Sequence, residues 1–102
     1  MIAEQFIIDL LDRVDIVDVV TRYIPLENKD GNLSAPCPFH ADTTSSFTVS
    51  HEKQFYECSI CGAQGSAIGF LMRYRHLHFL IAVEELARSV SMPVHYKSEN
   101  SA

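Results

Sequence analysis

The sequence predicts an α+β domain in which a small antiparallel β-sheet is packed by N- and C-terminal helices. Apolar residues recur with helical spacing at both ends of the chain, and two short β-prone runs lie in the middle. Closely spaced cysteine and histidine residues flank those two runs. A length of 102 residues fits one small domain. We assign residues 1–92 to this domain and 93–102 to a flexible tail or the start of a linker.

The first segment of the chain is expected to form a helix. Its apolar positions fall on one face of a helix with 3.6 residues per turn, and they are Phe6, Ile7, Leu10, Leu11 and Val14. Asp15 has the side chain of an N-cap, which predicts a second helix directly after the first. Pro25 restricts residue 24 to extended backbone, so we expect the second helix to end before it.

The middle of the chain has the pattern of a β-sheet of three or four short strands. Residues 47–50 and 54–58 are β-prone, and residues 50–53 between them are typical of a hairpin connection. Residues 29–32 carry turn chemistry. Strand alternation would place Phe55 and Glu57 on one face and Tyr56 on the other. Phe47 and Val49 share a face that we expect to be buried.

Two further helices are expected after the sheet. The first covers residues 67–73, and the second runs from about residue 78 to residue 89 before Pro93. The second is amphipathic, with one apolar side formed by Phe79, Val83, Leu86, Ala87 and Val90.

Composition and charge exclude several classes of protein. The chain is 47% hydrophobic and 21% charged, as in ordinary globular domains. No apolar stretch is long enough for a membrane span, and the acidic N-terminus lacks the pattern of a secretory signal peptide. The net charge is −5, and the first 30 residues contribute −4 of it. The chain therefore has no overall basic footprint for nucleic acid.

The cysteine and histidine spacing predicts a metal site. Cys37 and His40 form one pair, and Cys58 and Cys61 form a second pair seventeen residues after the first. Three thiolates and one imidazole suit a tetrahedral zinc ion. Since four protein ligands leave no position for an activated water, we expect one structural zinc. Gly62 and Gly65 follow the second pair, where glycine supplies positive φ or close backbone approach.

The motifs CPFH, SFTVS, KQFYECSICGAQG, AIGFLM and AVEELA occur in that order. Together they resemble the N-terminal zinc-binding domain of bacterial DNA primases, over about residues 5–90. The resemblance implies a zinc ribbon, with its core at about residues 26–66 and its zinc ligands at Cys37, His40, Cys58 and Cys61. The sequence departs from the usual pattern of this family at Ser45, His51, Ser59 and Ile60.

The resemblance also implies a role. Such domains help a primase to bind single-stranded DNA, start RNA primers and set their length in DNA replication. The nucleotidyltransferase activity belongs to a separate polymerase domain, so this chain alone is expected to be inactive. The implied partners are the template, the polymerase domain of the same or a neighbouring primase and, through the parent protein, the replicative helicase. The implied location is the cytoplasm of a bacterium or of a phage-infected cell.

Single-stranded DNA binding requires cations and exposed aromatic faces. The candidates here are Lys29, Lys53, Phe55, Tyr56, Arg73 and Arg75. With so few cations, we expect weak and strongly salt-dependent binding.

Two alternatives remain open. A zinc ribbon with acidic helices and few cations is also compatible with a module that only docks to other proteins. A more remote alternative is a zinc-dependent, nucleobase deaminase-like enzyme, because His40 and Asp42 precede a Cys-x-x-Cys pair. In that case the zinc would have three protein ligands, and Cys37 would not be one of them.

Overall fold

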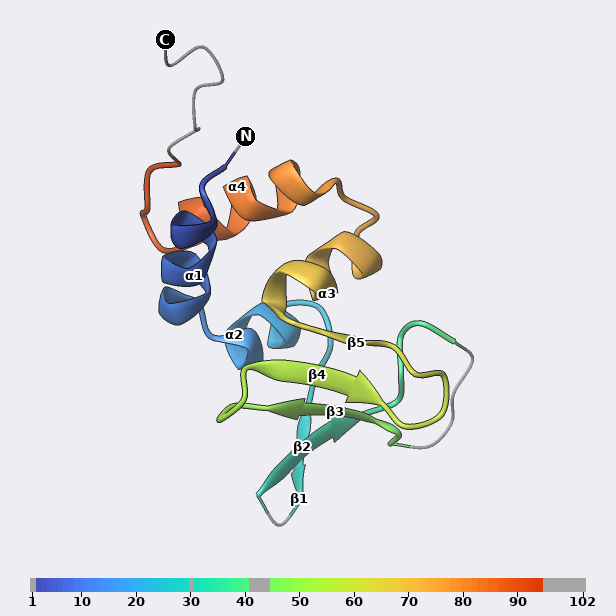
Figure 1. The fold of residues 1–102 in the computed structure, drawn as a ribbon. Helices are drawn as coiled ribbons and strands as arrows, with labels where there is room; N and C mark the ends of the chain where they lie inside the picture. The colour runs from blue at the N-terminus through green and yellow to red at the C-terminus, as the bar shows by residue number, and fades with distance from the viewer. Residues whose placement is uncertain (1, 30, 41–44, 95–102) are drawn as a thin grey trace, which may run out of the picture.

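A computed structural model describes residues 2–29, 31–40 and 45–94, and its side-chain detail omits Lys29. It contains a five-stranded antiparallel sheet in which each strand pairs with the next one along the chain. Four helices lie on one side of this sheet (Figure 1). The predicted α+β architecture is therefore confirmed. None of the helices in these ranges is long and apolar enough to cross a membrane.

The two N-terminal helices are α1 (Glu4–Arg13) and α2 (Ile16–Thr21). Asp15 is the N-cap of α2, and its carboxylate accepts a hydrogen bond of 3.0 Å from the Val17 amide, as predicted. The second helix ends at Thr21, four residues before Pro25, and a turn follows it.

The sheet is formed by β1 (Glu27–Lys29), β2 (Asn32–Ala35), β3 (Phe47–Ser50), β4 (Phe55–Cys58) and β5 (Gln64–Gly65). The β3–β4 hairpin is the one predicted. The expected number of three or four strands was too low. The β1–β2 hairpin pairs around the predicted turn, but its polar sequence lacks a β signal. The strand β5 is only two residues long, too short for a periodic pattern to mark it.

The C-terminal helices are α3 (Ala67–Tyr74) and α4 (Phe79–Ser89). The buried face of α4 is Ala82, Val83, Leu86 and Ala87. The prediction that Phe79 belongs to this face is wrong. Phe79, Leu80 and Ile81 are all at least 40% exposed, because the first turn of α4 is not covered by another element.

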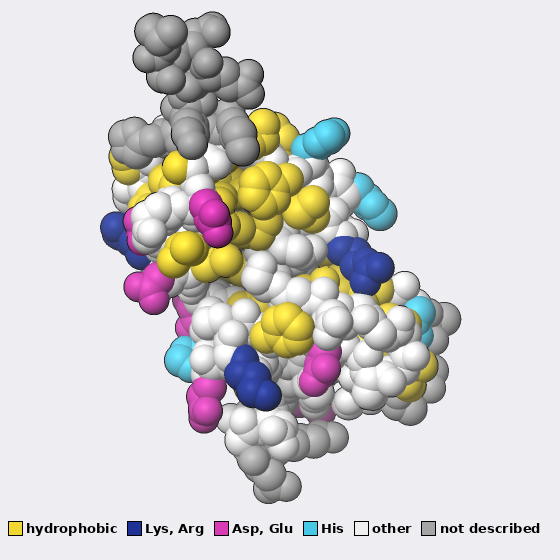
Figure 2. All heavy atoms as spheres, viewed as in Figure 1, with side chains coloured by type: hydrophobic (Ala, Val, Ile, Leu, Met, Phe, Trp, Pro, Cys, Tyr) yellow, Lys and Arg dark blue, Asp and Glu magenta, His cyan; other side chains and the backbone are white. Residues whose placement is uncertain are grey.

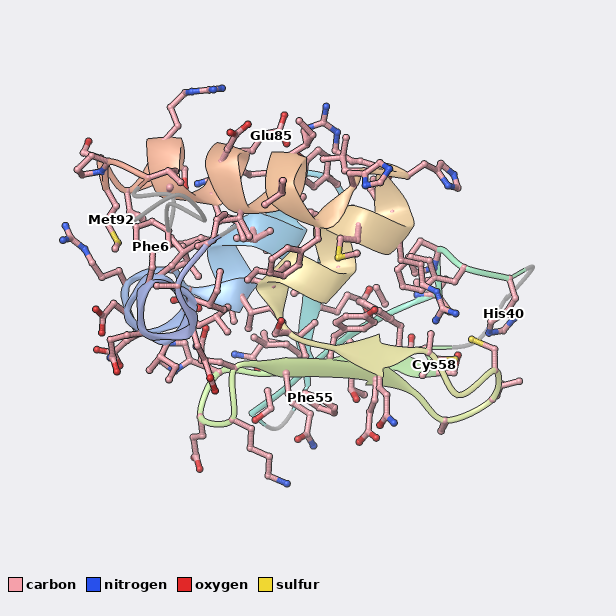
Figure 3. The ribbon with its side chains drawn as sticks, turned by 45° about the horizontal axis from the view of Figure 1, so that its top comes forward. Phe6, His40, Phe55, Cys58, Glu85 and Met92 are labelled. Atoms are coloured by element: carbon pink, nitrogen blue, oxygen red, sulfur yellow. The ribbon has the colours of Figure 1, made fainter. Side chains whose placement is uncertain are left out.

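The core lies between the helices and the inner face of the sheet. Phe47, Tyr56 and Phe70 are almost fully buried there, and their ring centroids are 5.5–6.3 Å apart. The predicted alternation in β4 is confirmed, because Tyr56 faces the helices while Glu57 is exposed. Figure 3 shows Phe55 on the opposite side of the sheet from α3 and α4. The core therefore joins the helices to the end of β4, where Cys58 lies.

Candidate metal centre

Two connections at one end of the sheet bring the four predicted ligands together. Cys37 and His40 lie in the loop after β2, Cys58 is the last residue of β4, and Cys61 lies in the turn before β5. The pairing of Phe47 with Cys58 places β4 directly beside the end of that loop. Figure 3 shows His40 and Cys58 facing each other beyond the strands.

The ligand atoms have the spacing of a tetrahedral metal site. All four lie within 4.8 Å of one another. The Sγ atoms of Cys37 and Cys61 are 3.8 Å apart, and His40 Nε2 is 3.2 Å from Cys58 Sγ. Zinc–sulfur bonds of about 2.3 Å would separate two sulfurs by about 3.8 Å at tetrahedral angles. The donor set and its geometry therefore fit one zinc ion.

Backbone amides of the two turns point at the sulfurs. The amides of Ile60 and Cys61 each donate to Cys58 Sγ at 3.4 Å, and the Phe39 amide donates to Cys37 Sγ at the same distance. Such hydrogen bonds orient thiolate ligands and offset part of their charge. Gly62 closes the second turn with a φ of 79°, which confirms the predicted need for glycine there.

Gly65 contributes to the site because its lack of a side chain allows close packing, and not because it has a positive φ. A Cβ at this position would lie 3.2 Å from Cε2 of the Tyr56 ring. The missing side chain lets β5 pack against β4, and this pairing holds the Cys61 turn beside Cys58.

The surroundings of Cys37 and Cys58 shift the pKa values of their thiols in opposite directions. Burial raises the pKa of Cys37 to about 12, and the neighbouring cysteines add to this effect. Burial also acts to raise the pKa of Cys58, but hydrogen bonds from the Cys61 and Ile60 amides, Ser46 and His40 outweigh it and hold the pKa at about 5. Without metal, the site therefore combines a stabilised thiolate with a protonated thiol. A bound cation would supply the charge that keeps both deprotonated.

A half-buried aromatic ring packs the ligand loop against the core. Phe39 lies between the ligands Cys37 and His40, and its ring centroid is 6.0 Å from both Phe47 and Phe70. The guanidinium of Arg73 lies over the outer face of the same ring, 5.5 Å from its centroid. Phe39 was not among the residues for which the sequence predicted a role. Its position inside the metal motif was the signal, because a large apolar residue between two ligands has to pack somewhere.

The comparisons with known proteins agree with this geometry. A family model described as the CHC2 zinc finger matches residues 2–102. The chain belongs to the CHC2 zinc finger family. A DNA primase from Pseudomonas putida is 53% identical over 94 residues, which are 92% of this chain and 14% of that protein. The Neisseria meningitidis serogroup A DNA primase is 48% identical over 103 residues, covering 98% of this chain and 18% of the relative.

A solved structure shows the same fold. The crystal structure of the Aquifex aeolicus primase, described as its zinc-binding and RNA polymerase domains, superposes with a TM-score of 0.82 and 37% identity. The match covers 95% of this chain and 24% of that one. The predicted resemblance, the zinc ribbon fold and the zinc cofactor are thereby confirmed. This CHC2 zinc finger domain spans less than a fifth of the primases that it resembles.

Four protein ligands make the site of this CHC2 zinc finger closed and structural. Cys37 belongs to the cluster, so no coordination position is left for an activated water. The deaminase-like alternative therefore gains no support from the geometry. Asp42, on which it depended, lies outside the described residues.

The structure separates the predicted nucleic-acid-binding residues into two groups. Lys53 is exposed in the β3–β4 turn, and Phe55 is half-buried on the outer face of the sheet. Tyr56 is only 1% exposed, so the prediction that it offers a ring face to a base is corrected. The side chain of Lys29 is outside the described residues.

The other group lies on the helical side. Arg73 and Arg75, which the sequence suggested as a local basic pair, point to different places. Arg73 lies over Phe39 near the metal ligands, whereas Arg75 donates to Glu85 Oε2 on α4 at 2.7 Å. Arg75 is therefore partly neutralised by an acidic side chain, and that partner could not be read from local sequence.

Proposed function

We propose that this domain binds one structural zinc through Cys37, His40, Cys58 and Cys61 and acts as the template-recognition domain of a DNA primase. The observation that carries the proposal is the superposition on a primase that contains a zinc-binding domain, with the four ligands in place. The domain would help a polymerase domain, in the same or a neighbouring primase, to bind single-stranded DNA and start RNA primers. In this proposal the nucleotidyl transfer itself belongs to that polymerase domain.

In this proposal the zinc acts through rigidity rather than chemistry. The ion would supply the charge that holds three thiolates together. The chain's own residues fix the β3–β4 hairpin through the ligand turn at Cys58, and the hairpin presents Lys53 and Phe55 to solvent. A cation beside an aromatic ring is the chemistry that binds single strands without sequence preference.

The charge of the surface predicts weak binding. Figure 2 shows charged side chains of both signs scattered over one face, with no broad basic field. Binding by the isolated domain should therefore be weak at physiological salt and stronger when the domain is held near a polymerase domain. The replicative helicase and a cytoplasmic location remain predictions that the resemblance implies through the parent protein.

A docking-only role is the second candidate. The exposed apolar turn formed by Phe79, Leu80 and Ile81 favours contact with another protein surface. The two candidates differ in what they require of the outer face of the sheet, so substitutions on that face and on the helical side separate them.

The test measures binding of a fluorescent single-stranded oligonucleotide to the zinc-loaded chain by anisotropy in 50 mM salt. Phe55→Ala combined with Lys53→Gln should weaken binding about tenfold, because a stacking face and a phosphate contact are both lost. Phe79→Ala is the matched control, since it removes an exposed phenylalanine from the helical side. If the natural chain fails to bind the oligonucleotide, the template proposal is wrong and the docking-only role is favoured.

A further inference from the structure

An arginine-rich hollow lies on the helical side of the domain, remote from the outer face of the sheet. It is lined by Arg22, Tyr23, Arg75, Glu85, Arg88 and Ser89 and has a volume of about 270 Å³. Figure 3 shows Glu85 on the side of α4 turned away from the sheet, and Phe55 beyond the opposite side of the sheet. These two surfaces therefore cannot contact the same short segment of a ligand.

The hollow is positively charged, in contrast to the chain as a whole. Three guanidinium groups and one carboxylate line it, although the chain as a whole carries −5. Arg75 is paired with Glu85, but Arg22 and Arg88 have no ion pair with any described residue. Unpaired cations brought together on a folded surface attract an anion that offsets their repulsion.

The arginine at the centre of the hollow is held in a fixed orientation. One terminal nitrogen of Arg75 lies 2.7 Å from Glu85 Oε2 and 3.4 Å from the hydroxyl of Tyr23. The guanidinium also lies 6.0 Å from the centroid of the Tyr23 ring. A guanidinium that is already oriented loses less entropy when its remaining N–H groups bind a phosphate.

Aromatic rings continue from this hollow toward the metal centre. Tyr23 is 37% exposed, and the centroid of its ring lies 5.3 Å from that of Tyr74. Tyr74 also lines a second hollow of about 370 Å³, together with Phe39, Arg73 and His76. Cationic and aromatic side chains thus alternate from α2 to the ligand loop, and this is the pattern of a surface that follows a single nucleic acid strand.

The outer face of the sheet is less suited to phosphate. The backbone pairing aligns Glu27, Ser34, Thr48, Glu57 and Gln64 across it, so this row contains two carboxylates. Lys53 is the sole described cation beside it, in the β3–β4 turn. The electrostatics therefore favour the helical side for the backbone of a strand.

We propose that the hollow lined by Arg22, Arg75 and Arg88 binds a backbone phosphate of single-stranded nucleic acid, and that the strand continues over Tyr23 and Tyr74 toward Arg73. This inference rests on the proposed template-binding function and assigns that function a path across the helices. Nucleic acid fits better than an acidic polypeptide, because an aromatic face beside the arginines, such as that of the exposed Tyr23, can stack with a base.

The test compares variants of the zinc-loaded chain for binding to a fluorescent dT12 oligonucleotide over a series of salt concentrations. Arg22→Gln combined with Arg88→Gln removes two cations and leaves the Arg75–Glu85 ion pair intact. Each phosphate contact to a single strand adds about 0.7 to the slope of log K against log salt. The double variant should therefore flatten the slope by about 1.4 and weaken binding roughly tenfold or more at 0.1 M salt.

Two controls make the result decisive. Arg13→Gln removes one exposed arginine that lies outside the hollow and contacts the Val90 carbonyl oxygen, so it should leave the slope unchanged. Zinc content and the thermal transition, measured for each variant, show whether it is folded. Loss of binding in the Arg13 variant equal to that in the double variant would mean that total charge alone matters, and would overturn the inference.

The remaining outcomes separate this inference from the proposed function. If the double variant binds normally while the Lys53 and Phe55 variant does not, the template function stands and the helical path is wrong. If the natural chain does not bind dT12, both fail. If a twelve-residue polyglutamate displaces dT12 from the natural chain at equal concentration, the hollow is an acidic-peptide site and the nucleic acid assignment falls.

Discussion

The helical end and the ligand end of this domain differ in what surrounds their side chains. At the helical end, Leu10, Val20 and Val83 are completely buried between α1, α2 and α4. At the ligand end, Cys61 is exposed and its neighbour Ile60 is 64% exposed. The helices are therefore stabilised by apolar burial, whereas the ligand turns depend on the metal and on hydrogen bonds to sulfur.

This difference indicates that a metal ion stabilises the ligand end, where the chain does not form a hydrophobic core. The two turns meet at one end of a short sheet, where the last residues of α3, Arg73 and Tyr74, line a hollow with Cys61. Large apolar side chains placed there would face water, while four small ligands around one ion need little cover. The aromatic cluster of Phe39, Phe47 and Phe70 couples the two ends.

Removal of the metal should have the largest effect and should act mainly on the ligand end. We expect a chelator, or Cys37→Ser, to lower the free energy of unfolding by at least about 5 kcal/mol, because binding energy at a structural zinc site is folding energy. Hydrogen exchange followed by mass spectrometry should show β3 and β4 exchanging faster, with a smaller change in α1.

The control is Ser59→Ala, which lies between the ligands Cys58 and Cys61 in the other ligand turn but carries no ligand atom. It should leave both zinc content and stability within about 0.5 kcal/mol of the natural chain. A folded Cys37→Ser protein with one full equivalent of zinc would show that Cys37 is not a ligand. Equal loss of protection at the two ends would show that they unfold as one unit.

Asp15 links the helical end to the β3–β4 hairpin, and its removal should have an intermediate effect. Its carboxylate caps α2 and also accepts a hydrogen bond of 3.3 Å from Gln54, while His51 Nε2 lies 3.3 Å away. Asp15→Ala should cost about 1–2 kcal/mol, measured by chemical denaturation. Zinc content should not change, because these contacts lie at the end of the hairpin remote from Cys58.

Asp12→Ala serves as the control for charge. Asp12 is exposed near the end of α1 and has no hydrogen bond or ion pair within the described part of the chain. We expect its loss to change stability by less than about 0.5 kcal/mol. A cost at Asp12 equal to that at Asp15 would show that net charge, rather than the cap, explains the result.

The sequence predicted best where chemistry or periodicity repeats at short range. The Cys37–His40 and Cys58–Cys61 spacings predicted the four-residue cluster that the structure brings together, and apolar spacing predicted α1 and α4. The β1–β2 hairpin was missed because its polar residues have low β propensity. The burial of Phe79 was predicted wrongly, because periodicity defines a face but does not show how far the covering elements extend.

Residues that meet through tertiary structure were harder to predict. Arg22, Arg75 and Arg88 belong to three different segments, and nothing in their local sequence shows that they line one hollow. The exposure of Tyr56 also depended on the helices that cover β4. Local rules placed its side chain on the correct face, but they did not show that the face is buried.

Alanine substitutions at two glycines, one at the helical end and one at the ligand end, should have the smallest effects. At both Gly69 in α3 and Gly62 in the ligand turn, an added Cβ would find no atom within 4 Å. Gly69→Ala should raise the free energy of unfolding by about 0.5–1 kcal/mol, because alanine favours the helix and restricts the unfolded chain. Gly62→Ala should lower it by about 1 kcal/mol, because its φ of 79° is unfavourable for a side chain. Chemical denaturation of both zinc-loaded variants measures the two changes, and if they had the same sign, backbone conformation would not be what distinguishes these two positions.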